Sequence, residues 1–134
     1  MPGHAITIVD DDDDFLEQLR GVLDAAGYTV HTFNRPESAY DAVRANPPGA
    51  VIIGIQFPNC QPGIDLATAL KLRPATRALP IILTADDAAR LRLYTDGPHG
   101  SAVVALWALP RPIDASALLP LLIQVIGRLE RAVP

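Results

Sequence analysis

The chain has 134 residues, of which 49% are hydrophobic and 19% charged, a composition typical of one globular domain with a single core. The formal net charge of −4 and the absence of a Lys/Arg cluster argue against a nucleic-acid-binding surface. One cysteine excludes an internal disulfide and favours a reducing, cytoplasmic location, and no apolar run is long enough to cross a bilayer. We therefore expect one domain over residues 1–134, without membrane contact.

The first predicted element is a strand over residues 5–9, whose sequence Ala-Ile-Thr-Ile-Val suits burial on both faces. Five consecutive aspartates, residues 10–14, follow it directly. Carboxylates gathered at the end of a strand repel one another unless a divalent cation, a basic side chain or a helix N-terminus lies among them. The acidic run therefore predicts a site that requires positive charge.

A helix is predicted after the acidic run, because apolar residues recur there at helical spacing. Asp12 or Asp13 can cap this helix, and Gly27 can end it. Residues 28–33 alternate in polarity, which predicts a second strand near an edge of the sheet. Asn34 is expected to cap the helix that follows, in which a proline occupies the first turn.

The middle of the chain continues the alternation. Residues 50–55 are apolar throughout and predict a central strand. A loop over residues 56–63 and a short helix over residues 64–72 follow. Residues 79–84 predict the fourth strand, and a less regular helix is expected from about residue 86 to 94.

A fifth strand is predicted over residues 102–109, and Asp114 is expected to cap a final helix that reaches about Arg131. Pro120 should break or kink the first turn of this helix, so regular helix is expected from about Leu119. Strand and helix thus alternate five times, which predicts an α/β fold with a doubly wound five-stranded parallel sheet and helices on both faces. Ligands of such sheets lie beyond the carboxyl ends of the strands.

Four motifs, in their order and spacing, resemble the receiver domain of two-component response regulators. Residues 8–11, Ile-Val-Asp-Asp, resemble the acidic pair that holds Mg²⁺, and residues 25–30 match the exit of the first helix. Residues 79–85 match the fourth strand with its switch hydroxyl, and residues 111–114 resemble the Lys-Pro step, often cis, before the last helix. The resemblance covers nearly the whole chain and implies a flavodoxin-like sheet with strand order 2-1-3-4-5.

The resemblance implies phosphoryl transfer from a histidine kinase to an aspartate at the end of the third strand. Here that position is Gly54, which offers neither an attacking oxygen nor a metal ligand. The Lys of the family aligns with Arg111, a bulkier and always charged group that we expect to reach toward Asp10 or Asp11 in place of the missing cation. These residues and Thr84 are therefore predicted to form a vestigial phosphorylation site.

No catalytic residue is predicted, and the chain is expected not to be an enzyme. Because one of the three carboxylates of the family is missing, we expect weak or no Mg²⁺ binding and no other cofactor. Asp10, Asp11 and Gln56 are the remaining candidate metal ligands. Without an acceptor nearby, Thr84 is interpreted as a strand-end hydroxyl that bonds to the backbone.

Apolar residues of the last strand and helix predict an interface. One stripe of the helix suffices to dock on the sheet, and a helix with a second apolar stripe usually has a second partner. The fifth strand is also apolar, although receiver topology places it at an edge. The alternative is a thicker monomer core covered by a remodelled fourth helix. The predicted interface residues of a homodimer are Val104, Leu106, Trp107, Leu119, Ile123 and Ile126.

The first functional hypothesis is an atypical receiver, or pseudo-receiver, that acts through contacts with itself and with a histidine kinase or another two-component protein. The alternative is a phosphotransfer receiver with a displaced acceptor: Asp10, Asp11 or Asp65. Geometry argues against the first two, which would have to be attacking group and metal ligand at once. A small-molecule binder at the same strand ends is a third possibility, and nothing in the sequence favours it.

Overall fold

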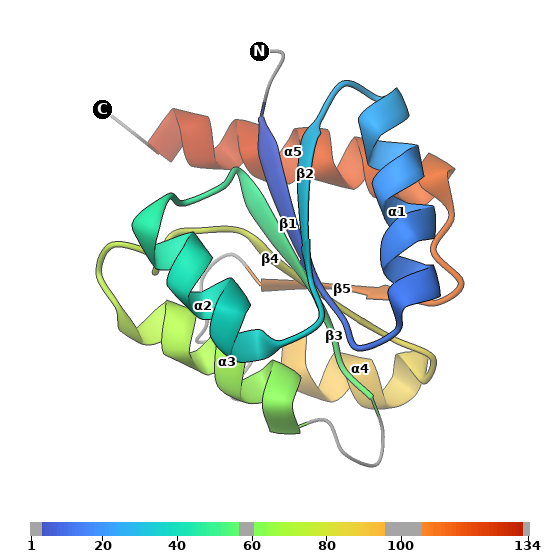
Figure 1. Ribbon diagram of the computed structural model, residues 1–134, viewed down its shortest axis with the longest axis horizontal. Helices are drawn as coiled ribbons and strands as arrows, with labels where there is room; N and C mark the ends of the chain where they lie inside the picture. Colours follow the sequence, from blue (N-terminus) through green and yellow to red (C-terminus); the bar gives the residue numbers. More distant parts are fainter. Residues whose placement is uncertain (1–3, 57–60, 96–105, 133–134) are drawn as a thin grey trace.

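The computed structural model describes residues 4–56, 61–95 and 106–132. Its five strands form one parallel sheet in the order β2-β1-β3-β4-β5 (Figure 1). This confirms the predicted fold class, including the strand order. The elements in chain order are β1 (Ala5–Val9), α1 (Asp13–Ala25), β2 (Thr29–Phe33), α2 (Pro36–Ala45), β3 (Ala50–Gly54), α3 (Gln61–Leu72), β4 (Ile81–Ala85), α4 (Ala88–Thr95), β5 (Leu106–Pro110) and α5 (Ala115–Ala132).

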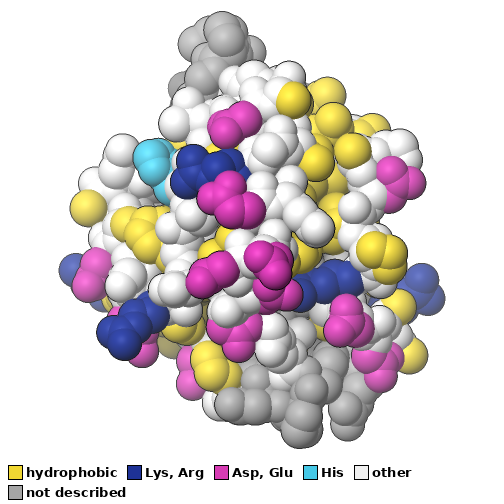
Figure 2. All heavy atoms as spheres, turned by 45° about the vertical axis from the view of Figure 1, so that its right-hand side comes forward, with side chains coloured by type: hydrophobic (Ala, Val, Ile, Leu, Met, Phe, Trp, Pro, Cys, Tyr) yellow, Lys and Arg dark blue, Asp and Glu magenta, His cyan; other side chains and the backbone are white. Residues whose placement is uncertain are grey.

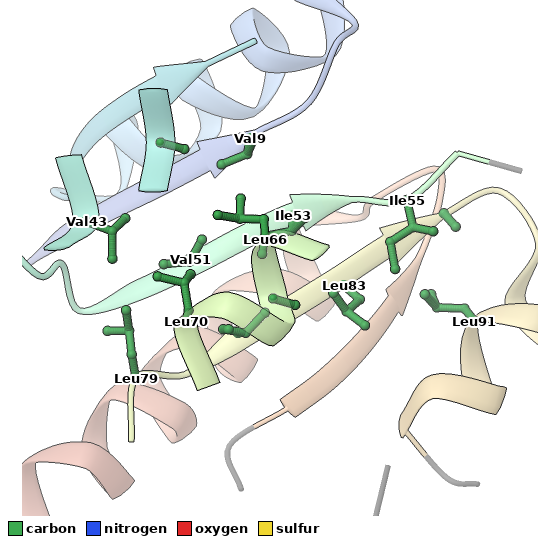
Figure 3. Packing of buried hydrophobic residues seen from close by; sticks show 14 residues of the cluster. Val9, Val43, Val51, Ile53, Ile55, Leu66, Leu70, Leu79, Leu83 and Leu91 are labelled. Atoms are coloured by element: carbon green, nitrogen blue, oxygen red, sulfur yellow. The ribbon is translucent and has the colours of Figure 1, made fainter. Parts of the chain in front are cut away.

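The sheet separates two hydrophobic cores. Helices α1 and α5 cover one face, and α2, α3 and α4 cover the other (Figure 1). Figure 3 shows the second core, in which Ile53 and Leu83 of the central strands meet Leu66 and Leu70 of α3. Burial on both faces explains why β3 and β4 are apolar almost throughout.

Helix α1 begins and ends at the capping residues that the sequence predicts, Asp12 and Gly27. The carboxylate of Asp12 accepts hydrogen bonds from the backbone N–H groups of Asp14 at 3.0 Å and Phe15 at 3.2 Å. It therefore satisfies two of the N–H groups that have no partner within the helix. Gly27 lies just beyond the other end with φ of +96°, a conformation that glycine adopts without strain.

Two helices begin elsewhere than predicted. Arg35, and not Asn34, is the residue before the first turn of α2, and its side chain makes no capping hydrogen bond. Because Pro36 has its φ fixed for the first helical position, the residue directly before it becomes the cap. Helix α3 begins at Gln61, before the predicted start at residue 64. Pro62 is accommodated because the first turn of a helix needs no N–H from it.

The last helix is regular over its whole length (Ala115–Ala132), so the predicted start near Leu119 is wrong. Asp114 caps it as predicted, since its carboxylate accepts a hydrogen bond from the N–H of Ser116 at 3.0 Å. Pro120 removes one bond, the one to the carbonyl of Ser116. Both residues are exposed, so water can satisfy that carbonyl in place of the missing N–H.

Two predicted interface residues are not part of the described surface. Ile126 is buried in the core between α5 and the sheet, so its assignment to an outer stripe is wrong. It follows Leu122 by four positions and therefore shares the inward face of the helix. Val104 lies outside the described residues, as does the predicted start of the fifth strand, and the described part of β5 runs from Leu106 to Pro110.

The two leucines near the end of α3 give a matched test of this packing. Leu70 is fully buried, whereas Leu72 is 74% exposed. Leu70→Ala should lower the free energy of unfolding by roughly 2–5 kcal/mol through lost burial and a cavity. Leu72→Ala should change it by less than about 0.5 kcal/mol. Urea denaturation measures both, and equal losses would show that α3 is not oriented as described.

Candidate functional site

Asp10 is the buried member of the acidic run. It follows β1, and its backbone N–H donates to the carbonyl of Phe33 at 3.1 Å, which holds it between β1 and β2. Its side chain is only 1% exposed. One carboxylate oxygen, Oδ1, accepts a hydrogen bond from the backbone N–H of Asp12 at 2.9 Å. The other oxygen faces the end of β5.

Arg111 supplies the positive charge that the acidic run requires. It follows β5, where its backbone N–H donates to the carbonyl of Ala85 at 2.9 Å, and its peptide bond to Pro112 is cis. The guanidinium Nη2 donates to Oδ2 of Asp10. Its planar group lies over the ring of Phe15, with 3.8 Å between Cζ and the ring centroid. As predicted, Arg111 reaches Asp10, and the side chain is only 12% exposed.

Thr84 belongs to the same network. Its hydroxyl is fully buried and accepts hydrogen bonds from Nε of Arg111 at 3.3 Å and from Nη2 at 3.2 Å. The sequence predicted a backbone partner for this hydroxyl and did not predict its contact with Arg111. The guanidinium presents a fork of donors, so it can serve the carboxylate of Asp10 and this hydroxyl together.

Gly54 lies directly beneath the ion pair. A Cβ atom at this position would overlap the carboxylate of Asp10 and lie 2.7 Å from Nη2 of Arg111. The two side chains thus occupy the space into which any side chain at Gly54 would project. The sequence predicts that the guanidinium of Arg111 takes the place of a missing cation. In the structure, Asp10 and Arg111 together lie where a side chain at position 54 would project.

Gln56 covers the carboxylates of Asp10 and Asp11 on the solvent side. Its side-chain Nε2 donates to Oδ1 of Asp11 and lies 3.5 Å from Oδ1 of Asp10. The side-chain amide of Gln56 thus lies against both carboxylates. Among residues 4–56, 61–95 and 106–132, no group of three His, Cys, Asp or Glu residues could hold a metal ion. Mg²⁺ takes oxygen ligands, and in this arrangement the carboxylates of Asp10 and Asp11 are engaged by Arg111 and Gln56.

Electrostatics at Asp10 are a balance of opposing effects. Burial raises the pKa of its carboxyl above the ordinary value of 3.8, while the hydrogen bond from Asp12 and the charge of Arg111 act in the opposite direction. The neighbouring charge of Asp11 adds to the increase. The carboxylate is thus held by specific partners against a cost of desolvation.

A cavity of about 370 Å³ opens beside the ion pair at the carboxyl ends of β1 and β3. Its lining combines Asp10, Asp11 and Gln56 with apolar groups such as Val9 and Ile53.

Asp65 lies away from Asp10 and Asp11, because it lines a groove between α2 and α3 and accepts a hydrogen bond from Gln61. Figure 2 shows acidic side chains spread over the face that includes α1, with a band of hydrophobic side chains at its right.

Phe15 is the site residue that the sequence did not reveal. It is one of the apolar residues that recur at helical spacing in α1, and its half-buried ring packs against the core beside that helix. The same ring also forms the platform for Arg111. The only available signal is an aromatic residue in the first turn of a helix that directly follows an acidic strand end.

Comparison with known proteins identifies relatives of one kind. The response regulator receiver domain family matches residues 6–97. The chain is 33% identical over 132 residues to the phosphoglycerate transport system transcriptional regulatory protein PgtA of Salmonella typhimurium, a match that covers 96% of the chain and 29% of that protein. It is 34% identical over 95 residues to the phosphate regulon transcriptional regulatory protein PhoB of Rhizobium meliloti, covering 69% of the chain and 41% of that protein.

A solved structure is similar over nearly the whole chain. A sensor protein from Polaromonas superposes with a TM-score of 0.80 at 26% identity, covering 94% of this chain and 98% of that one. The chain spans well under half the length of the two curated relatives. In the described part of the chain, no helix is both long and apolar enough to cross a membrane.

The balance at Asp10 predicts the sign of a pH effect. Because its folded-state pKa is raised above 3.8, the folded chain binds this proton more tightly than the unfolded chain. Ionisation above the folded pKa therefore lowers the free energy of unfolding, and the loss is recovered as the pH falls through that pKa. Relative to Asp10→Asn, which cannot ionise, the wild type should gain stability as the pH falls from about 7 toward about 4.

Denaturant unfolding at several pH values measures this difference. Asp114→Asn is the control of opposite sign, since a hydrogen bond from Ser116 lowers the pKa of the exposed Asp114 carboxyl. Stability that depends on ionised Asp114 is lost as the pH falls through its folded pKa. If Asp10 behaved like Asp114, attraction by Arg111 would outweigh desolvation and the account of Asp10 would be wrong.

Proposed function

The chain belongs to the response regulator receiver domain family, and from this premise we propose that it acts in two-component signalling without being phosphorylated itself. It is a signalling module that works through protein–protein contacts. One observation carries the proposal: the space of a side chain at Gly54 is filled by Asp10 and Arg111. A phosphoryl group would need both an acceptor and room at this point.

The partners of Arg111 support a fixed site. Its guanidinium is engaged with Asp10, with the hydroxyl of Thr84 and with the ring of Phe15 at once. These groups belong to the end of β1, to β4 and to α1, so one side chain joins three elements. Separating such a buried pair leaves an uncompensated charge, which is strongly unfavourable. We infer that the site stays in one arrangement and does not switch on phosphorylation.

The alternative acceptors are poorly arranged for phosphotransfer. Asp10 is buried within the ion pair, and Asp11 shares the amide of Gln56. Asp65 lies on α3 and faces the groove with α2. With the metal ligands of the family incomplete, we propose that Mg²⁺ binds weakly or not at all, and that none of the three carboxylates accepts a phosphoryl group.

We propose a histidine kinase or another two-component protein as one partner, in the cytoplasm. A groove of about 460 Å³ between α1 and the segment that joins β5 to α5 supports such a contact. Its lining combines apolar side chains with carboxylates and the side chain of Arg111. These residues include Phe15, Leu19, Val22 and Ile113 among the apolar groups and Asp12, Asp14 and Asp86 among the acids.

We further propose a homodimer through β5 and α5. Ile123 is 69% exposed on the outer side of α5, and Leu119 is half-buried beside it. On β5, Leu106 and Trp107 are each half-buried although the strand is last in the sheet. Partly exposed apolar residues on an edge strand and a neighbouring helix favour pairing with a second copy.

Incubation with acetyl phosphate and Mg²⁺, followed by intact-mass measurement, tests the proposed function. We expect no mass increase, because no carboxylate stands at Gly54 and Asp10 is held by Arg111. A phosphorylated species would contradict the proposal. Peptide mapping in the variants Asp10→Asn, Asp11→Asn and Asp65→Asn would then identify the acceptor.

A double substitution provides the positive control. Gly54→Asp restores the carboxylate, and Arg111→Lys replaces the guanidinium by the smaller ammonium group of the family. If only the site chemistry has been lost, this variant should gain Mg²⁺ binding, measured by calorimetry, and a mass increase with acetyl phosphate. Gly54→Asp alone should fail, because Arg111 still holds the carboxylate of Asp10 in the space that the new side chain requires.

Charge substitution on α5 tests the dimer. Ile123→Asp places a carboxylate in the proposed apolar interface and should shift the chain toward the monomer by at least tenfold in dissociation constant. Leu72→Asp is the matched control, because Leu72 is similarly exposed but lies on α3. Analytical ultracentrifugation over a concentration series measures both, and a wild-type chain that stays monomeric at high concentration would contradict the dimer.

A further inference from the structure

The groove between α2 and α3 has a charge distribution that the phosphorylation site does not explain. These helices lie side by side on one face of the sheet (Figure 1). The groove between them has a volume of about 530 Å³. Glu37 and Asp41 stand on the α2 side, and Asp65 stands on the α3 side. All three carboxylates are exposed.

The floor of the groove is apolar and its lining contains no Lys or Arg. Tyr40 and Ala69 are half-buried and Leu66 is buried, so a bound side chain would meet a mostly apolar surface. Pro36 and Pro62 line both this groove and the cavity beside Asp10 and Asp11. The two hollows therefore adjoin one another, and neither lining contains a basic residue.

Tyr40 gives the groove a fixed aromatic surface. Arg44 lies over its ring at 5.1 Å from the centroid, and Nη1 of Arg73 donates to its hydroxyl at 3.2 Å. The ring is thus held from two sides before anything binds, which reduces the entropy lost on binding. The two guanidinium groups also place positive charge beyond the acidic part of the groove.

We propose that the α2–α3 groove binds a basic segment of a partner protein. Lys or Arg side chains of that segment pair with Glu37, Asp41 and Asp65, and an apolar side chain between them covers the floor at Tyr40 and Leu66. An acidic residue of the partner fits beyond Tyr40, near Arg44 and Arg73. The opposite charges increase the rate of association and fix the direction in which the segment lies.

A short synthetic peptide of alternating lysine and leucine is the probe, with glutamate in place of lysine as its counterpart. Backbone amide shifts of the isotope-labelled chain report where each peptide binds. We expect the lysine peptide to shift amides of α2 and α3, more weakly at higher salt, and the glutamate peptide to leave them unchanged. No phosphoryl donor is present, so the result is independent of whether the chain is phosphorylated.

A triple variant, Glu37→Gln with Asp41→Asn and Asp65→Asn, should weaken binding of the lysine peptide by about tenfold, as expected for three exposed ion pairs. The matched control carries Glu17→Gln, Asp13→Asn and Asp24→Asn on α1, which makes the same change in net charge at exposed positions. Its affinity should stay within about twofold of the wild type. Absent binding, shifts centred on α1, or equal losses in both variants would overturn the proposal.

Discussion

One buried ion pair, between Asp10 and Arg111, determines the arrangement of the whole site. The carboxylate comes from the end of β1 and the guanidinium from the residue after β5, so the pair joins segments on both sides of the central strands. Removing two charges from water is costly, and the cost is offset only when further hydrogen bonds satisfy both groups. Here the N–H of Asp12, the hydroxyl of Thr84 and the ring of Phe15 complete those contacts. All of these contacts depend on Gly54, because any larger residue would enter the same space.

The same contacts show how the carboxylates of Asp10 and Asp11 are accommodated in this structure. Donors from Arg111 and Gln56 reach the two carboxylates that a dication would otherwise bridge. The chain keeps the receiver scaffold, and the proposal that Mg²⁺ binds weakly or not at all rests on these side-chain contacts. The proposed contacts with partners lie on the surface: on β5 and α5, in the groove beside α1, and in the acidic groove between α2 and α3. The groove between α2 and α3 lies on the face of the sheet opposite to α1 and α5.

The sequence predicted the sheet because strand and helix periodicities alternate without interruption, and each central strand is apolar on both faces. The resemblance to receiver domains, which aligns Arg111 with the Lys of the family, predicted that Arg111 reaches toward Asp10 or Asp11, and Asp10 is the residue that it contacts. The sequence could not show that the pair lies over Gly54, because that depends on side-chain directions in three dimensions. The contact between Phe15 and Arg111 could not be predicted for a related reason. A residue in the first turn of a helix can face the core and a strand end together. Ile126 was assigned to the wrong face, because the inward arc of α5 is wider than one stripe.

Two glycine substitutions test the central claim that the ion pair fills the space above Gly54. Gly21 lies within α1 with no atom near the position of a Cβ, so Gly21→Ala should raise the free energy of unfolding by about 0.5–1 kcal/mol. Gly54→Ala should lower it by about 1–3 kcal/mol, because the new methyl group forces Asp10 and Arg111 apart. In an Arg111→Ala background, Asp10 is free to turn away, and Gly54→Ala should lower the free energy of unfolding by clearly less. Gly54→Ala that is neutral or stabilising in the wild-type chain would contradict the account.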